Sequence, residues 1–157
     1  PIQKMPSLVA ACKFVGTTSL GLFTGASYSL AALSIPALLA FPSAKPAHHV
    51  LISLKQTASL HLRSLAVISL LSFNLAYALS PARGRHPYLL WTSLVASLAA
   101  ASDLVPGQSL PALDQDDVNG ETVEKAVKSS QTLEQARATI GFAGFAMAVI
   151  GIWGDGS

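Results

Sequence analysis

Three histidines are the first residues of this sequence whose chemistry suggests a site. His48 and His49 are adjacent, and His61 follows them on the same side of a long apolar run. Imidazole binds zinc well, but a catalytic zinc site needs three protein ligands that converge on one point. The apolar runs contain no Asp, Glu or further His to complete such a set. We therefore expect these to be histidines of an interfacial loop, and we expect no metal site.

The acidic stretch DQDDVNG (114–120) resembles part of a calcium-binding loop. Aligning Gly120 with the invariant glycine of such a loop puts Ala126 where the bidentate glutamate must stand, so this reading fails. The sequence contains no GxSxG, HExxH or P-loop motif, and Cys12 is its only cysteine. We therefore predict a protein that is not an enzyme and that holds no cofactor.

Charged residues are few, and their distribution predicts the fold class. They make up 11% of the chain, against roughly 25% in an ordinary soluble domain. The formal net charge of +2 is too small to indicate a partner nucleic acid. Four long runs carry no charge, and about 20 apolar residues suffice to cross a bilayer. We predict an all-α polytopic membrane protein, a four-helix transmembrane bundle that forms one domain over 1–157. The expected spans are 14–39, 58–80, 87–103 and 137–153, with a polar loop over 103–136.

A soluble helical bundle is the alternative to a membrane bundle. It would require one polar face on each helix, repeated every 3.6 residues. The stretches 65–79 and 138–153 have no charged face, which favours the membrane. Pro36 lies inside the first expected span, and because proline disrupts a helix interior, we expect that helix to bend or end near Ser34.

The second half of the polar loop is typical of a helix. Glu121 and Lys125, and likewise Glu124 and Lys128, have the i,i+4 spacing of helical ion pairs. A weak apolar stripe accompanies them, formed by Val123, Ala126 and Val127. The sequence leaves open whether this stripe lies on the membrane surface or on the bundle.

Small residues in the first and last spans predict close helix packing. Gly21 and Gly25 are one turn apart, and so are Gly144 and Ala148. In lipid, small residues at this spacing let two helix backbones approach closely. We expect the first and last helices to be neighbours through these four residues. Packing within the bundle is favoured, and association with a second copy or another protein stays open.

The stretch RGRHPYLLW (83–91) joins two apolar runs and predicts a tight turn. Pro87 suits the first turn of the third helix, because its missing N–H has no partner there anyway. Four spans place this turn and the C-terminus at one membrane face, where aromatic and basic side chains anchor a protein. The expected interfacial belt, a partner for anionic lipids, consists of Tyr77, Arg83, Arg85, His86, Pro87, Tyr88, Trp91 and Trp153.

Three segments resemble a known family. KFVGTTSLGLFTG (13–25), RHPYLL (85–90) and GFAGFAMAVIGIWGDG (141–156) are similar to the fungal mitochondrial outer-membrane family of autophagy-related protein thirty-three. This resemblance implies four membrane spans, no cleaved presequence and a role in the selective removal of mitochondria by autophagy. The acidic loop departs from the family, which often has a long, serine-rich loop at this place.

We therefore expect a non-enzymatic, multi-pass protein of the mitochondrial outer membrane that promotes mitophagy. Its expected partners are membrane lipids and another membrane or autophagy protein. Two other functions stay open at this point: a structural or assembly subunit of a larger mitochondrial membrane complex, and a small transporter or lipid-handling enzyme.

Overall fold

A computed structural model describes residues 5–81, 86–101 and 120–154, and every regular element among them is a helix. The elements in chain order are α1 (Met5–Ser29), the π-helical turn η2 (Leu30–Ser34), α2 (Ile35–Ala37), the 3₁₀ turn η3 (Leu38–Ala40), α3 (Ala44–Leu79), α4 (Tyr88–Ala101) and α5 (Gly120–Gly154). The all-α prediction is therefore confirmed for the described residues.

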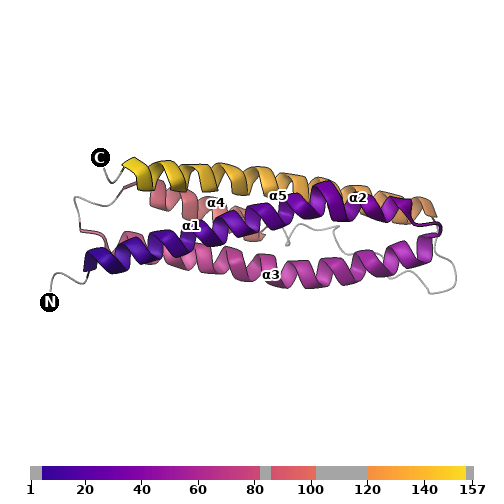
Figure 1. Cartoon of the computed structure of the whole chain (residues 1–157), viewed down its shortest axis with the longest axis horizontal. Helices are drawn as coiled ribbons and strands as arrows, with labels where there is room; N and C mark the ends of the chain where they lie inside the picture. Colours follow the sequence, from indigo (N-terminus) through magenta and orange to yellow (C-terminus); the bar gives the residue numbers. More distant parts are fainter. Residues whose placement is uncertain (1–4, 82–85, 102–119, 155–157) are drawn as a thin grey trace.

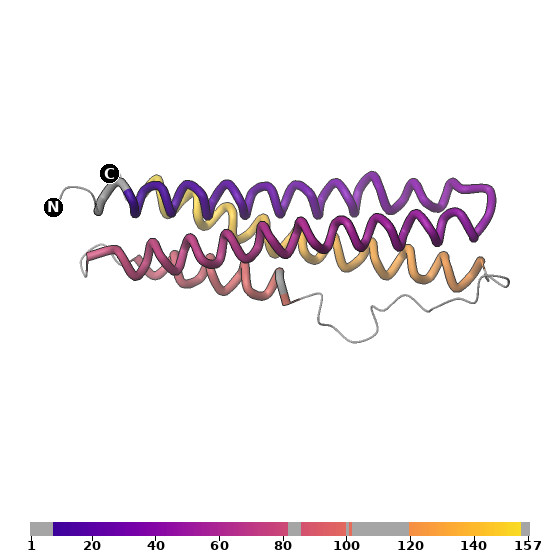
Figure 2. Tube along the Cα trace, turned by 90° about the horizontal axis from the view of Figure 1, so that it is seen from below, coloured from indigo at the N-terminus to yellow at the C-terminus, as the bar shows by residue number. Residues whose placement is uncertain are grey.

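The helices form an elongated antiparallel bundle. The elements from α1 to η3 make one continuous rod, and α3 and α5 both pack along it (Figure 1). The short helix α4 packs on α3 and α5, on the side away from α1 (Figure 2). The start of α1, the end of α3, the start of α4 and the end of α5 lie together at one end. This is the up-and-down order typical of four-helix bundles.

Because α4 stops partway along the bundle, the molecule has two halves. The four-helix half contains α1, α4 and residues 56–79 and 138–154. Its core includes Leu20, Phe23, Leu62, Phe73, Leu89 and Ala148. The three-helix half contains residues 30–40, 44–55 and 120–137. Its separate core is formed by Ile35, Leu38, Ala47, Leu51, Val123 and Val127.

Three helices are long and apolar enough to cross a membrane: the rod over Leu8–Ala40, α3 and α5. The fourth helix, α4, has 14 residues, which extend about 21 Å at 1.5 Å per residue. A bilayer core is about 30 Å thick. Three of the four expected spans thus coincide with helices that are long and apolar enough to cross a membrane, while α4 is shorter than an ordinary span.

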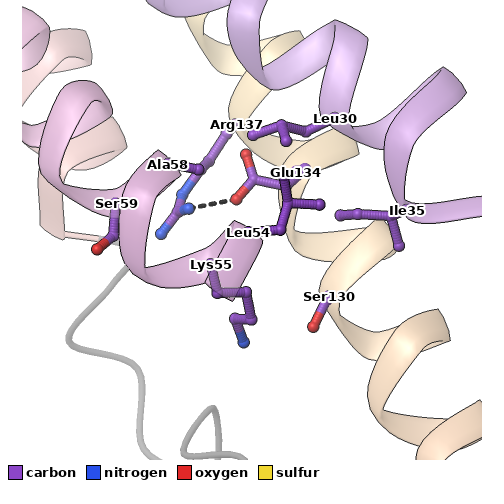
Figure 3. Close-up of a pocket in the computed structure, with 9 residues that line it drawn as sticks. All are labelled: Leu30, Ile35, Leu54, Lys55, Ala58, Ser59, Ser130, Glu134 and Arg137. Atoms are coloured by element: carbon purple, nitrogen blue, oxygen red, sulfur yellow. Dashed lines mark hydrogen bonds and ion pairs between the residues drawn. The ribbon is translucent and has the colours of Figure 1, made fainter. Parts of the chain in front are cut away.

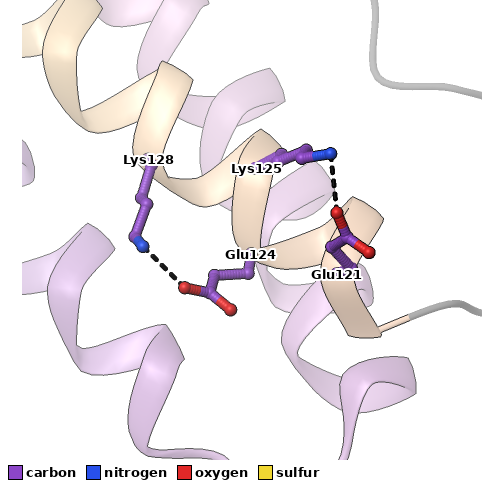
Figure 4. A network of polar contacts seen from close by, with 4 residues as sticks. All are labelled: Glu121, Glu124, Lys125 and Lys128. Carbon is purple, nitrogen blue, oxygen red and sulfur yellow. Dashed lines mark hydrogen bonds and ion pairs between the residues drawn. The ribbon is translucent and has the colours of Figure 1, made fainter.

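Three helices begin well before the expected spans, since α1 starts at Met5 and α3 and α5 extend even further ahead. α3 starts at Ala44, and Pro46 is tolerated there because it lies in the first turn. α5 starts at Gly120 and contains both predicted ion pairs: Lys125 Nζ lies 2.7 Å from Glu121, and Lys128 Nζ lies 2.6 Å from Glu124 (Figure 4). The apolar stripe packs on the bundle, because Val123 and Val127 are buried against α3 and the rod.

Pro36 distorts the helix near Ser34 without ending it, so of the two expected outcomes, a bend or an end, the end is wrong. The backbone widens into one π-helical turn, in which the N–H of Ile35 donates to the carbonyl of Leu30. This turn makes room for the proline ring, and the rod continues to Ala40. It stops at Phe41, which is extended (φ −68°, ψ 139°). A following proline disfavours helical geometry, and Pro42 follows here.

The core of the three-helix half can be tested with a charge. Val127 is fully buried, so Val127→Asp places an unpaired carboxylate among aliphatic side chains. We expect it to lower the free energy of unfolding by ~2 kcal/mol or more. Ser129→Asp, at an exposed position of the same helix, should have little effect. Thermal unfolding in detergent, followed by circular dichroism, measures both. Equal melting of the two variants would show that α5 does not pack as described.

Candidate functional site

The glycines of α5 allow it to lie against two other helices. A Cβ atom built on Gly144 would come within 2.6 Å of Val95 in α4 and 3.2 Å of Leu20 in α1. Gly141 sits in the same way against Thr24 of α1, at 2.6 Å. Ala148 is fully buried in the core of the four-helix half. A larger residue at Gly141 or Gly144 fits only if a side chain of a neighbouring helix shifts.

On α1, the two glycines of the predicted packing pair have different surroundings. A Cβ atom on Gly21 would lie 2.9 Å from the Phe145 ring of α5. Gly25 has nothing within 4 Å of such an atom and is exposed. The inclusion of Gly25 in the packing face is therefore wrong. The i,i+4 spacing carries Gly25 past the edge of the contact, and Thr24 faces α5 instead.

Tyr88, a member of the predicted interfacial belt, contacts side chains or backbone of two other helices. Its ring covers Gly151 of α5, where a Cβ atom would come within 2.5 Å of the ring. Lys13 Nζ lies 5.8 Å from the ring centroid, which is the geometry of a cation–π contact. His86 is exposed, with its ring centroid 6.1 Å from that of Tyr88. The start of α4 is thus attached to both α1 and α5.

The other belt residues have less contact with the protein. Trp91 is 60% exposed and Trp153 is 86% exposed, whereas Tyr77 packs against the core. Pro87 begins the first turn of α4, where its carbonyl accepts the N–H of Trp91 at 3.2 Å. Arg83 and Arg85 lie outside the described residues. The belt residues that the structure describes all lie toward the end of the bundle where α4 begins.

The histidines do not assemble a metal site. They lie on α3, not in a loop, so that expectation is wrong, because the helix begins at Ala44. The rings of His48 and His49 are 6.4 Å apart, and His61 Nδ1 lies 2.8 Å from the carbonyl of Thr57. Among the described residues, no group of three His, Cys, Asp or Glu side chains could hold a metal ion.

The most polar buried site lies where the two halves meet. It is a cavity of about 30 Å³ between the rod, α3 and α5. Such a volume holds on the order of one or two water molecules. Figure 3 shows the residues that line it: Leu30, Ile35, Leu54, Lys55, Ala58, Ser59, Ser130, Glu134 and Arg137.

An ion pair dominates this cavity. Arg137 Nη1 donates to Glu134 Oε1 at 2.5 Å, and both residues are buried, at 4% and 7% exposure. Lys55 is half-buried on α3 and close enough to be attracted by Glu134 and repelled by Arg137. Removing two charges from water costs several kcal/mol per ion, so this pair adds little net stability. Both side chains belong to α5, three residues apart, so the pair stays formed wherever that helix lies, and only its surroundings depend on the position of α5.

A second polar contact satisfies a backbone carbonyl beside Pro36. Ile35 donates to Leu30, and Pro36 has no N–H, so the carbonyl of Ala31 lacks a partner within its own helix. Gln131 Nε2 of α5 donates to this carbonyl at 3.2 Å. The amide of Gln131 thus satisfies a backbone group that the proline leaves unpaired.

These polar contacts were not among the predicted site residues. Gln131, Glu134 and Arg137 follow Val127 along α5 at spacings of three or four residues, so they continue the face that packs on the bundle. This helical spacing is the feature of the sequence from which their position on the packed face of α5 could be predicted. None of these contacts supplies a nucleophile with a neighbouring base, so the geometry supports helix positioning.

The glycine contacts give a matched pair of substitutions. Gly144→Leu must displace Val95 and Leu20, and we expect it to lower the free energy of unfolding by ~1–3 kcal/mol. Gly25→Leu projects into open space and should leave it unchanged. Thermal unfolding in detergent compares the two. An equal loss in both variants would mean that the glycines act through helix flexibility and not through contact.

The amide of Gln131 gives a second prediction. Gln131→Leu leaves the carbonyl of Ala31 unpaired, at a cost of ~1 kcal/mol. In a Pro36→Ala background, residue 36 supplies a backbone N–H to the helix. Gln131→Leu should then lower the free energy of unfolding much less. A double-mutant cycle on the free energy of unfolding in mixed micelles measures this coupling. The same cost in both backgrounds would contradict the proposed role of Gln131.

Comparison with known proteins agrees with the resemblance seen in the sequence. The family model described as "Autophagy-related protein 33" matches residues 5–136. A protein of that name from Gibberella zeae (strain PH-1) is 40% identical over 185 residues, which cover 95% of this chain and 92% of that protein. No solved structure matches the fold. A model match and a relative that both cover most of the bundle show that the chain belongs to the autophagy-related protein 33 family.

Proposed function

We propose that this protein is a multi-pass protein of the mitochondrial outer membrane that promotes the selective autophagy of mitochondria. Family membership over most of the chain is the observation that carries this proposal. The relative is named as an autophagy-related protein, and three helices here are suited to a membrane. In this proposal α4 is the fourth span, and the bilayer or neighbouring residues accommodate its short length.

The proposed action is binding and not catalysis. The cavity around Glu134 and Arg137 has room for only about one or two water molecules, which disfavours transport or processing of a lipid through it. The small residues Gly21, Gly144 and Ala148 are already used inside the bundle. A partner must therefore meet the outer surface: lipids on the exposed apolar side chains, and an autophagy protein on the polar faces of α3 and α5.

Deletion and rescue in a fungus test this proposal. We expect loss of the family gene in Gibberella zeae to reduce delivery of a mitochondrial-matrix reporter to the vacuole several-fold. Expression of this chain should restore delivery, and Gly25→Leu should restore it equally. A reporter of bulk autophagy is the control and should be unaffected.

Three results would count against the proposal. The first is a normal rate of mitochondrial turnover in the deletion strain. The second is an equal loss of bulk autophagy. The third is recovery of the chain at fixed stoichiometry in a larger mitochondrial complex whose assembly fails without it, which would indicate an assembly subunit instead.

A further inference from the structure

The rod presents an apolar outer face beyond the end of α4. In the three-helix half its large exposed side chains are Leu33 (68%) and Leu39 (48%), and Phe41 (41%) follows directly after the rod. The smaller exposed residues beside them, such as Ala32 and Ala37, are also apolar. Nothing among the described residues covers this face.

At the same level, the outer faces of the other two helices are mostly polar. The contact of Gln131 with Ala31 shows that residues near 131 on α5 lie level with residues near 31 on the rod. The cavity contains Leu30, Leu54 and Ser130, so α3 near residue 54 is at this level too. The exposed residues there include Lys45, His49 and Ser53 on α3, and Glu124, Lys128 and Thr132 on α5, with Val50 as an apolar exception. The three-helix half is therefore amphipathic as a unit.

The apolar face continues the membrane-spanning part of α1 without a break. No charged residue lies between Lys13 and Lys45, whereas Arg63 and Arg137 end the uncharged runs of α3 and α5 much earlier. The helical residues of the rod within this run, 14–40, extend about 40 Å at 1.5 Å per residue. The uncharged end of α5 extends about 26 Å, and α4 about 21 Å, by the same rise.

We propose that the rod lies in lipid along its whole length, so that the three-helix half is a membrane-surface segment and not a stalk in water. A lipid surface is favoured over a protein partner because the apolar face is continuous with the part of α1 that faces lipid. Helices with one apolar face and one charged face lie at such interfaces with the apolar side buried. The outer faces of α3 and α5 at this level then lie in water.

This arrangement gives the bundle different hydrophobic lengths on its two sides. The uncharged length of the rod exceeds the thickness of a bilayer core, about 30 Å, whereas the length of α4 is smaller than that thickness. A bilayer meets such a difference through tilt of the protein or through a local change of thickness. The protein thus acts on the shape of the membrane around it, independently of any role in mitophagy.

Spin-label accessibility on the full-length chain tests the proposal. In a Cys12→Ser background, nitroxides are attached to L33C and L39C on the rod and to the matched exposed positions S53C and T132C. L22C, in the four-helix half at 59% exposure, is the lipid-facing control. The protein is reconstituted in phosphatidylcholine–phosphatidylethanolamine vesicles, and circular dichroism checks that each variant is folded.

We expect the ratio of oxygen to nickel-complex accessibility at 33 and 39 to resemble that at 22 and to exceed that at 53 and 132 several-fold. Water-like values at 33 and 39 would overturn the proposal. Low accessibility of these positions to both reagents, rising when the labelled protein is diluted with unlabelled protein, would also overturn the proposal. It would show that a second copy covers the face. Should the labelled variants misfold, quenching by brominated lipid of Phe41→Trp, in a background in which Trp91 and Trp153 are changed to Phe, decides the same question: strong quenching supports lipid contact, and none overturns it.

Discussion

The close approach of α5 to α1 and α4 is the contact on which the rest of the bundle depends. Lipid offers apolar side chains no advantage in meeting one another, so helices in a membrane associate through tight packing. Gly141, Gly144 and Gly151 provide that packing, because each one faces a side chain of a neighbouring helix at a distance that excludes a Cβ atom. Because these three contacts lie at successive points of α5, they allow the helix only one position along its axis.

That position determines the polar contacts further along the helix. With Gly141 against Thr24, the next turns of α5 bring Gln131 to the open carbonyl of Ala31. The same turns bury Glu134 and Arg137 beside Lys55. Neither contact supplies much net stability, but a shifted α5 would leave the carbonyl of Ala31 without the amide of Gln131. The ion pair lies within α5 and moves with that helix. The glycines therefore supply the attraction, and the hydrogen bond of Gln131 favours this register over its neighbours.

The sequence predicted the helices well, because the absence of charge over long runs is a direct consequence of a lipid environment. It predicted their boundaries less well. Charge marks where the membrane ends, and α3 and α5 continue as helices into water-facing sequence with residues such as Lys45 and Glu121. The i,i+4 pairs over 121–128 were correct because they depend only on local helix geometry.

Contacts between helices were harder to predict, since they depend on register. The spacing of Gly21 and Gly25 suggests one packing face, yet only Gly21 meets α5. Gln131 is an ordinary surface residue by composition, and its role follows from a π-helical turn one hundred residues earlier in the chain. The buried pair of Glu134 and Arg137 likewise looks like the edge of a polar loop until the position of α5 is known.

The way the small residues are used limits how a member of the autophagy-related protein 33 family can act through this fold. Because Gly144 and Ala148 are buried inside the bundle, the stripe that would dock a second transmembrane helix is already occupied. Among the described residues, a soluble partner finds its polar groups chiefly on α3 and α5 in the three-helix half. There Glu121, Glu124, Lys125 and Lys128 are exposed in ion pairs that exchange readily with water. Such pairs contribute little to the stability of the fold. The surface that they form can therefore exchange its contacts without destabilising the four-helix half, which is packed through its glycines.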